Sequence, residues 1–377
     1  MDKNAHHKRV WRLIHWPVTT VFKLLFHYSC EKYQPEGPTL VISNHVTNYD
    51  PFFVAASFPK HQMYFVASEH LFRKGWLTKI INYLVAPICR RKGSNGADTA
   101  MTMLRALRKG QSVCIFGEGE TTWNGLSNQS FPGTGDIAKI GKATLMTYRI
   151  EGGYLTAPRW SKGIRRGKMR GYVVNTYTPE MLAGMSSAEI NDAINRDITE
   201  NAWERQKEEY QRFKGKRRAW LIETALFLCP KCHQLGTIRG EGHHVRCSCG
   251  LDTVFTEYGA FDPPVPFENM LEWDRWQHQH LQEADSLPAF TEDGVRLLAL
   301  NGDHTQTEAA VGQLKLEDGV MSIGEYAFAL KDISHLALVQ KHLMIFTHQQ
   351  NYYELHAPHP VCFRKYLAVW QNQNEKA

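Results

Sequence analysis

The sequence predicts an α/β domain with a mixed sheet flanked by helices, followed by a small cysteine-rich module and a β-rich C-terminal domain. Three observations predict this order. From Gly37 to about Ile164, short apolar runs alternate with amphipathic segments. Four cysteines are bunched between positions 229 and 249, and from Val295 onwards short strand-like stretches are separated by turn residues. The length of 377 residues suits two or three domains.

The composition is that of an ordinary globular protein, with 43% apolar and 22% charged residues, which excludes collagen, coiled coil and bulk disorder. The net charge of +6 is gathered in clusters. Such clusters suit phosphates in a site or an anionic membrane surface, with a plain solvated surface as the alternative. They contain Lys8, Arg9 and Arg12, then Arg90, Arg91 and Lys92, then positions 162–170 and 214–218.

Residues 1–34 are predicted to contain an amphipathic helix, because residues 10–28 repeat apolar positions at helical spacing. Trp11 and Trp16 with their basic neighbours fit a helix that lies in the headgroup region of a membrane. A helix packed on the domain behind it explains the same pattern. No apolar run reaches the ~20 residues that cross a bilayer, so we expect no spanning segment. We expect no secretory signal either, because Arg12, His15 and Lys23 interrupt the N-terminal apolar stretch. The apolar face contains Val10, Leu13, Ile14, Pro17, Val21, Leu24, Leu25 and Tyr28.

Residues 35–220 are predicted to form the α/β domain. Strands are expected at 39–43, 63–67, 85–89, 112–116 and 144–150, with helices near 70–83 and 97–109 between them. A charged helix is expected at 187–213, with Ser187 as its N-cap and Glu189 just inside it.

Residues 225–258 carry the spacing of a zinc ribbon. Cys229 and Cys232 form one close pair, and Cys247 and Cys249 form a second. Two such pairs on hairpin turns can place four thiolates tetrahedrally around zinc, and four protein ligands indicate a structural site. The second pair is one residue tighter than usual, so His243 or His244 could substitute as a ligand. Clustered thiols also favour a reducing compartment.

Residues 265–377 are predicted to contain a connector with one helix and then a β-rich domain. Asp318 and Gly319 form a hairpin-type turn pair. Several short strands closed by a C-terminal helix resemble a pleckstrin-homology-like barrel. The strands are expected at 311–316, 320–323, 326–330, 336–339, 342–347 and 352–355, and the helix at about 361–370.

The first candidate site follows the strand that ends at Ser43. Functional residues gather where a strand meets a loop. His45 and Asp50 can meet across such a turn, so that the carboxylate orients the imidazole while the imidazole takes a proton from an alcohol. Taken alone, the pair is more readily explained by a helix cap and a hydrogen-bonded histidine.

The surrounding blocks give the pair a different meaning. Asn44 and His45 followed by Asp50 resemble the Asn-His-x-x-x-x-Asp signature of the glycerolipid acyltransferase family, which includes lysophosphatidic acid acyltransferases. A second block closes an apolar run with Arg90 or Arg91, whose guanidinium would bind a phosphate. The resemblance covers roughly residues 35–165.

The third family block, Phe-Pro-Glu-Gly-Thr-Arg, is represented by Phe116-Gly-Glu-Gly-Glu-Thr, in which Glu118 and Gly119 match. Thr121 stands where the family has arginine, which removes a phosphate contact. Either Lys92, Arg159 or Lys162 replaces this contact, or the acceptor is not plain lysophosphatidate.

The resemblance implies acyl-CoA or acyl-carrier protein as the donor and a lysophospholipid such as 1-acylglycerol-3-phosphate as the acceptor. It makes His45 the general base, oriented by Asp50. It assigns substrate binding to Asn44, Arg90, Arg91, Glu118 and Gly119.

Two alternatives remain at this point. One is acyl transfer to a different lipid or to an amine, and the other is a non-catalytic lipid-binding adaptor. We expect a cytoplasmic protein, peripheral on the inner face of the membrane, that binds phospholipids and no nucleic acid. Its C-terminal modules are candidates for contact with a protein partner.

Overall fold

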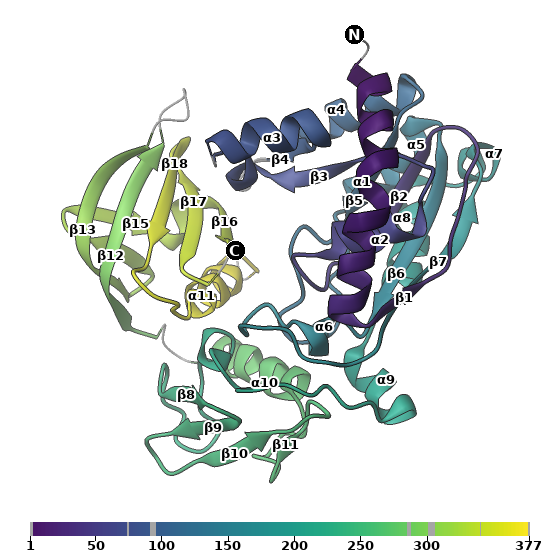
Figure 1. The fold of residues 1–377 in the computed structure, drawn as a ribbon. Coiled ribbons are helices and arrows are strands. Elements are labelled where there is room, and N and C mark those ends of the chain that lie inside the picture. The colour runs from purple at the N-terminus through teal and green to yellow at the C-terminus, as the bar shows by residue number, and fades with distance from the viewer. Residues whose placement is uncertain are drawn as a thin grey trace. The chain divides into compact units, whose positions relative to one another are not determined.

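The computed structural model describes residues 3–73, 75–90, 96–284, 288–300, 306–339 and 341–375 (Figure 1). They fold into two compact units. The first contains the described residues up to Gly215 except Trp160–Lys162, and the second contains Trp160–Lys162 and the described residues from Lys216 onwards.

A mixed seven-stranded sheet forms the centre of the first unit, with strand order β1-β7-β6-β2-β5-β3-β4. Strands β6, β2, β5 and β3 run parallel, whereas β7 pairs antiparallel with β6. The predicted α/β class with a mixed sheet is confirmed. The strands are β1 (Tyr28–Cys30), β2 (Thr39–Ser43), β3 (Met63–Ser68), β4 (Ile88–Arg90), β5 (Ser112–Phe116), β6 (Thr144–Glu151) and β7 (Met169–Tyr177).

Strands β2 and β5 are buried along their whole length, as expected for central strands of a parallel sheet. Successive side chains of a strand point to opposite faces, so Leu40 and Ile42 belong to one apolar core and Val41 to another. Side chains from α4, α5 and α8 complete the first core, and side chains from α1 and α2 complete the second. Because both strands are covered along their length, only side chains in the loops at their ends can contact a ligand. The helices are α1 (Lys3–Phe26), α2 (Asp50–Ser57), α4 (Ala97–Arg108), α5 (Gly133–Gly141), α6 (Gly153–Thr156), α7 (Pro179–Ala183) and α8 (Ser187–Ile198).

The helix predicted at 70–83 is interrupted in the structure. It divides into the 3-10 turn η1 (Glu69–Arg73) and α3 (Trp76–Leu84). Because α3 continues to Leu84, the strand predicted from position 85 begins only at Ile88.

The charged helix predicted at 187–213 is also divided, into α8 and α9 (Ala202–Glu209). The side chain of Asn201 accepts the N–H groups of Trp203 and Glu204 and so starts a new helix. Ser186, one residue before the predicted cap, is the N-cap of α8 and forms a capping box with Glu189.

Helix α1 exposes most of the apolar face that its sequence pattern defines, but Tyr28, predicted to belong to that face, lies buried in β1. Leu13, Trp16 and Leu24 leave 76%, 74% and 74% of their surface exposed. Trp11 and Phe26 lie on the other side of the helix and are buried. In the described part of the chain, no helix is both long and apolar enough to cross a membrane.

The cysteine-rich module of the second unit is a small antiparallel sheet with strand order β11-β10-β9-β8. The turn η2 (Ile222–Thr224) precedes it and α10 (Met270–Glu283) follows it. The strands are β8 (Ile238–Glu241), β9 (His244–Cys247), β10 (Asp252–Phe255) and β11 (Phe261–Asp262).

Seven antiparallel strands form the C-terminal part of the second unit, in the order β15-β14-β13-β12-β18-β17-β16. Asp318 and Gly319 join β13 to β14 with φ of 48° and 73°, as a tight two-residue hairpin requires. The predicted β-rich character is confirmed, whereas the pleckstrin-homology-like identity stays a prediction. The elements are β12 (Phe290–Leu300), β13 (Gln306–Glu317), β14 (Val320–Ile323), β15 (Tyr326–Ala329), η3 (Leu330–Asp332), β16 (Ile333–Val339), β17 (Leu343–His348), β18 (Asn351–His356) and α11 (Arg364–Glu375).

Candidate active site

The ends of β2 and β5 bring two of the predicted sequence blocks together. The strands are parallel, and Ser43 pairs with Phe116. The chain leaves β2 at Ser43 and enters α2 at Asp50, while it leaves β5 toward Glu118. Because the carboxyl ends of adjacent parallel strands lie at the same edge of a sheet, these two loops meet there.

His45 and Asp50 form a hydrogen-bonded pair at this edge. Nδ1 of His45 lies 2.7 Å from Oδ2 of Asp50. The Asp50 side chain is fully buried, whereas 20% of the His45 side chain is exposed. The imidazole also stacks on Phe116, with ring centroids 4.6 Å apart and planes at 22°. The ring is thus fixed on one edge and one face while part of it stays accessible.

Three further donors hold the Asp50 carboxylate. The N–H of Val46 lies 2.7 Å from Oδ2, and the N–H and hydroxyl of Thr47 lie 3.0 Å and 2.7 Å from Oδ1. With so many donors aimed at it, the carboxylate accepts from Nδ1–H of His45 as well. Nε2 of His45 then carries the lone pair and can take a proton from a hydroxyl group.

Asn44, predicted to bind substrate, uses its amide on the backbone of Ile150. Its Nδ2 donates to the Ile150 carbonyl at 2.8 Å, and its Oδ1 accepts the Ile150 N–H at 2.7 Å. The side chain is buried and joins the end of β2 to β6. These two hydrogen bonds fix the position of the residue before His45. They account for the buried amide of Asn44 without a contact to substrate.

Glu118, also predicted to bind substrate, joins two loops. One carboxylate oxygen accepts the N–H of His45 at 2.7 Å, and the other accepts the N–H of Asn128 at 2.7 Å. Burial raises the pKa of Glu118 well above its ordinary value of 4.5, against the opposing effect of these two donors. The geometry therefore gives Glu118 a positioning role toward the backbone of His45.

Gly119 and Arg90 lie together beside Phe131. The guanidinium carbon of Arg90 is 4.4 Å from the centroid of the Phe131 ring. Gly119 has φ of +77°, and a Cβ there would lie 2.4 Å from the Phe131 ring and 3.5 Å from Arg90 Nη1. Both the backbone conformation and the space require glycine. Burial lowers the pKa of Arg90, and Arg91 lies outside the described residues.

A different arginine approaches the place where the third sequence block lacks one. Nη1 of Arg159 donates to the carbonyl of Thr121 at 3.1 Å and lies 2.5 Å from the Glu120 carboxylate. The guanidinium carbon also lies 4.1 Å from the centroid of the Trp123 ring. Only 7% of the Arg159 side chain is exposed.

Arg159 is thus one of three basic residues that the sequence offered as replacements, and it adjoins the block. Lys162 instead lies 5.1 Å over the Trp220 ring in the second unit. Lys92 lies outside the described residues. Sequence reasoning did not anticipate the parts played by Thr47 and by the Phe116 ring, because both depend on how the loop after β2 turns back.

The Acyltransferase family model matches residues 26–151, a segment that contains β2, the His45–Asp50 pair and the loop after β5. This segment is an acyltransferase domain. Family membership, which the sequence blocks predicted, is confirmed for it. The acyltransferase domain thus includes both loops that hold His45.

The crystal structure of the 1-acyl-sn-glycerophosphate (LPA) acyltransferase PlsC from Thermotoga maritima is similar to the chain, with a TM-score of 0.42 and 15% identity. The similarity covers 52% of this chain and 82% of that one. No curated protein sequence matches the chain.

Outside the acyltransferase domain, the second unit contains a group of residues that can hold a metal ion. The sulfur atoms of Cys229, Cys232, Cys247 and Cys249 all lie within 4.8 Å of one another. Cys229 and Cys249 are 3.7 Å apart, as are Cys232 and Cys247. A disulfide needs about 2.05 Å, whereas tetrahedral zinc–sulfur bonds of about 2.3 Å place sulfurs roughly 3.8 Å apart. The four thiols therefore fit zinc.

The two nearby histidines have other partners. Nδ1 of His244 lies 2.8 Å from Asp252, and Nδ1 of His243 accepts the N–H of Arg218 at 3.3 Å. The alternative in which a histidine replaces a cysteine ligand is therefore not favoured.

Proposed function

We propose that the acyltransferase domain moves a fatty acyl group from acyl-CoA or acyl-carrier protein to the hydroxyl of a lysophospholipid such as 1-acylglycerol-3-phosphate. The observation that carries this proposal is the 2.7 Å hydrogen bond between His45 and Asp50. It lies within the segment that matches the family model.

In the proposed reaction, Nε2 of His45 removes the proton from the acceptor hydroxyl. The hydroxyl oxygen attacks the thioester carbonyl carbon, so that a C–O bond forms and the C–S bond breaks. The thiolate leaves and takes the proton back from Nε2, which restores the neutral imidazole. Asp50 keeps the ring in one orientation and stabilises its positive charge meanwhile.

Arg90 is the residue that we propose for the phosphate of the acceptor. Its guanidinium is partly withdrawn from water, which is why burial lowers its pKa. In the described part of the chain, no carboxylate forms an ion pair with it. A desolvated guanidinium without a carboxylate partner is stabilised by a phosphate, which it can bind through two parallel hydrogen bonds.

The pair formed by Glu120 and Arg159 favours a second candidate within the same chemistry. Because Glu120 neutralises Arg159, the third block supplies less positive charge than the family pattern would. An acceptor with less negative charge than a phosphate monoester, such as another lipid alcohol or an amine, suits such a site.

Peripheral attachment to the inner face of the membrane is part of the proposal. Tyr49 and Phe52 flank Asp50 and are 39% and 38% exposed. The Phe52 ring stacks on Phe22 of α1 at 4.0 Å, so this apolar surface continues onto the exposed face of the helix. A lipid acceptor could then reach His45 from the bilayer surface.

We also propose that the four cysteines hold a structural zinc ion. Zinc supplies tetrahedral crosslinks there, and four thiolate ligands leave no position for a substrate. The strands of this region are short, and a metal crosslink would add to their stability.

The proposal is tested by giving the purified protein either acyl-CoA or acyl-carrier protein as donor, together with lysophosphatidate, a zwitterionic lysolipid, a neutral lysolipid or an amine. The products are then separated. Transfer to lysophosphatidate supports the main proposal, and transfer only to the neutral or amine acceptors supports the second candidate. No transfer to any acceptor, with either donor, would favour the adaptor.

A further inference from the structure

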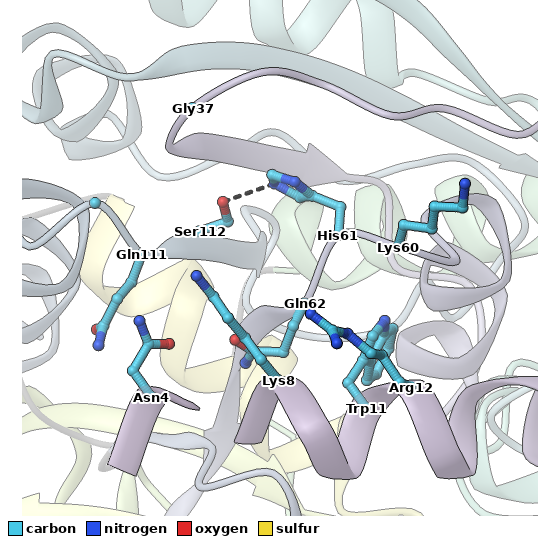
Figure 2. Close-up of a pocket in the computed structure, with 11 residues that line it drawn as sticks. Asn4, Lys8, Trp11, Arg12, Gly37, Lys60, His61, Gln62, Gln111 and Ser112 are labelled. Atoms are coloured by element: carbon cyan, nitrogen blue, oxygen red, sulfur yellow. Dashed lines mark hydrogen bonds between the residues drawn. The ribbon is translucent and has the colours of Figure 1, made fainter. Parts of the chain in front are cut away.

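A cavity of about 330 Å³ lies in the first unit (Figure 2). It is at the opposite edge of the sheet from His45. It is lined by residues of α1 and by residues at the amino ends of β2, β3 and β5, among them Gly37 and Ser112. His45 follows the carboxyl end of β2. The five residues of β2 span roughly 16 Å. The cavity is therefore separate from the candidate active site.

The charge of this cavity is positive. Lys8 and Arg12 come from two successive turns of α1, and Lys60 comes from the segment between α2 and β3. Figure 2 shows Lys8 extending from α1 toward Ser112. The lining contains no aspartate or glutamate, and within the described ranges none of the three cations forms an ion pair. Three cations from two elements thus face a cavity whose described lining carries no opposing charge.

Polar groups in the wall add hydrogen-bonding capacity. Trp11 is buried, with 7% of its surface exposed. Its indole N–H has no hydrogen-bond partner among the described residues. A buried donor without a partner is costly, so this wall has hydrogen-bonding capacity that the described residues do not use. Nε2 of His61 lies 2.7 Å from the Ser112 hydroxyl, which also accepts the Thr39 N–H. Burial lowers the pKa of His61, so its ring is neutral at neutral pH.

We propose that this cavity binds a phosphate group, at a second site that takes no part in acyl transfer. A phosphate offers several acceptor oxygens to the cations and the neutral donors, which a single carboxylate would not satisfy. Its source is either a phospholipid headgroup or a soluble phosphate ester. The headgroup is favoured because α1, which supplies Lys8 and Arg12, also exposes Leu13 and Trp16.

The test compares two double variants of the full-length protein, each losing two positive charges from α1. Lys8→Gln with Arg12→Gln removes cavity cations, whereas Arg9→Gln with Lys23→Gln removes cations that do not line the cavity. The probes are phosphatidylcholine vesicles with and without phosphatidylglycerol, and glycerol 3-phosphate in solution. We expect the first variant to bind the anionic vesicles about tenfold more weakly than the second, with equal binding to phosphatidylcholine alone.

Loss of glycerol 3-phosphate binding in the first variant, without a vesicle effect, would support the phosphate site and assign it to a soluble ester. Equal losses in both double variants, or no phosphate-dependent binding by the wild type, would overturn the proposal. Lys60→Gln provides a second variant on another element if the helix variants unfold, and it should reproduce the loss. The difference between the two double variants should persist when each also carries Arg90→Gln, which separates this cavity from the phosphate contact proposed at Arg90.

Discussion

The Arg159 guanidinium and the Glu120 carboxylate form an ion pair beside the loop that follows β5. The two residues are 39 positions apart in the chain. Arg159 also donates to the carbonyl of Thr121, the position at which the family pattern has its own arginine. The positive charge is therefore present near the block, but a neighbouring carboxylate balances it.

This balance predicts the effect of Glu120→Gln. Removal of the carboxylate leaves the charge of Arg159 without the balancing charge of Glu120, so KM for lysophosphatidate should fall about tenfold, or about 1.4 kcal/mol. KM for a neutral lysolipid should not change, and Glu208→Gln, at an exposed position on α9, should change neither value. Steady-state kinetics with both acceptors checks this, and equal shifts for both acceptors would show that the pair does not govern headgroup charge.

The buried Glu118 predicts a pH-dependent stability. Because burial raises its pKa in the folded protein above 4.5, its stabilising contribution is full below pH 4.5 and is lost as pH rises through the folded-state pKa. Glu118→Gln cannot ionise and avoids this loss, although it forfeits one acceptor at a cost of about 1 kcal/mol. The unfolding free energy of the wild type minus that of the variant should therefore fall with rising pH.

Urea unfolding between pH 4.5 and 8 measures this difference, with the exposed Glu208→Gln as the control that should show no trend. If the difference in unfolding free energy between the wild type and Glu118→Gln did not change with pH, the pKa of Glu118 would not be raised in the folded protein.

Local pattern predicted much of the fold because buried strands and tight turns leave clear signals. The continuous apolar runs at 39–43 and 112–116 are β2 and β5, and Asp318-Gly319 is the hairpin turn between β13 and β14. The break in the helix at 187–213 was missed because it depends on the Asn201 cap, which competes locally with an otherwise helical composition.

The candidate site was predictable only in part. His45 and Asp50 could be paired because both lie in one short loop. The uses of Asn44 and Glu118 could not, because their partners Ile150 and Asn128 come from other segments of the chain. A side chain that the sequence predicts to contact substrate can instead hydrogen-bond to a backbone group. That backbone group comes near it only in the folded chain.

The cysteine cluster predicts one equivalent of bound zinc. Cys232→Ser should lower the zinc content well below one equivalent and destabilise the second unit, because one ligand of a closed tetrahedral site is lost. Cys89→Ser, at an exposed cysteine outside the cluster, should retain the metal. Metal analysis of protein prepared without chelators decides, and a wild type without zinc would contradict the assignment.

The exposed face of α1 predicts an effect of Leu24→Asp on membrane binding. Leu24 is 74% exposed, and burying such a side chain in lipid contributes about 2 kcal/mol, so vesicle partitioning should fall about 30-fold. Met181→Asp changes an exposed apolar residue on α7 in the same way and should have little effect. Co-sedimentation with vesicles compares the two, and similar losses would argue against α1 as the contact surface.

The most direct test of the account is the turnover of His45→Ala with radiolabelled acyl-CoA and the acceptor that the wild type uses best. A general base contributes about 10²- to 10⁴-fold, so kcat should fall by that factor while His335→Ala, at an exposed histidine of the second unit, matches the wild type. Thermal unfolding of both variants establishes that they are folded. A folded His45→Ala protein that turns over as fast as the wild type would contradict the role of the His45–Asp50 pair in acyl transfer.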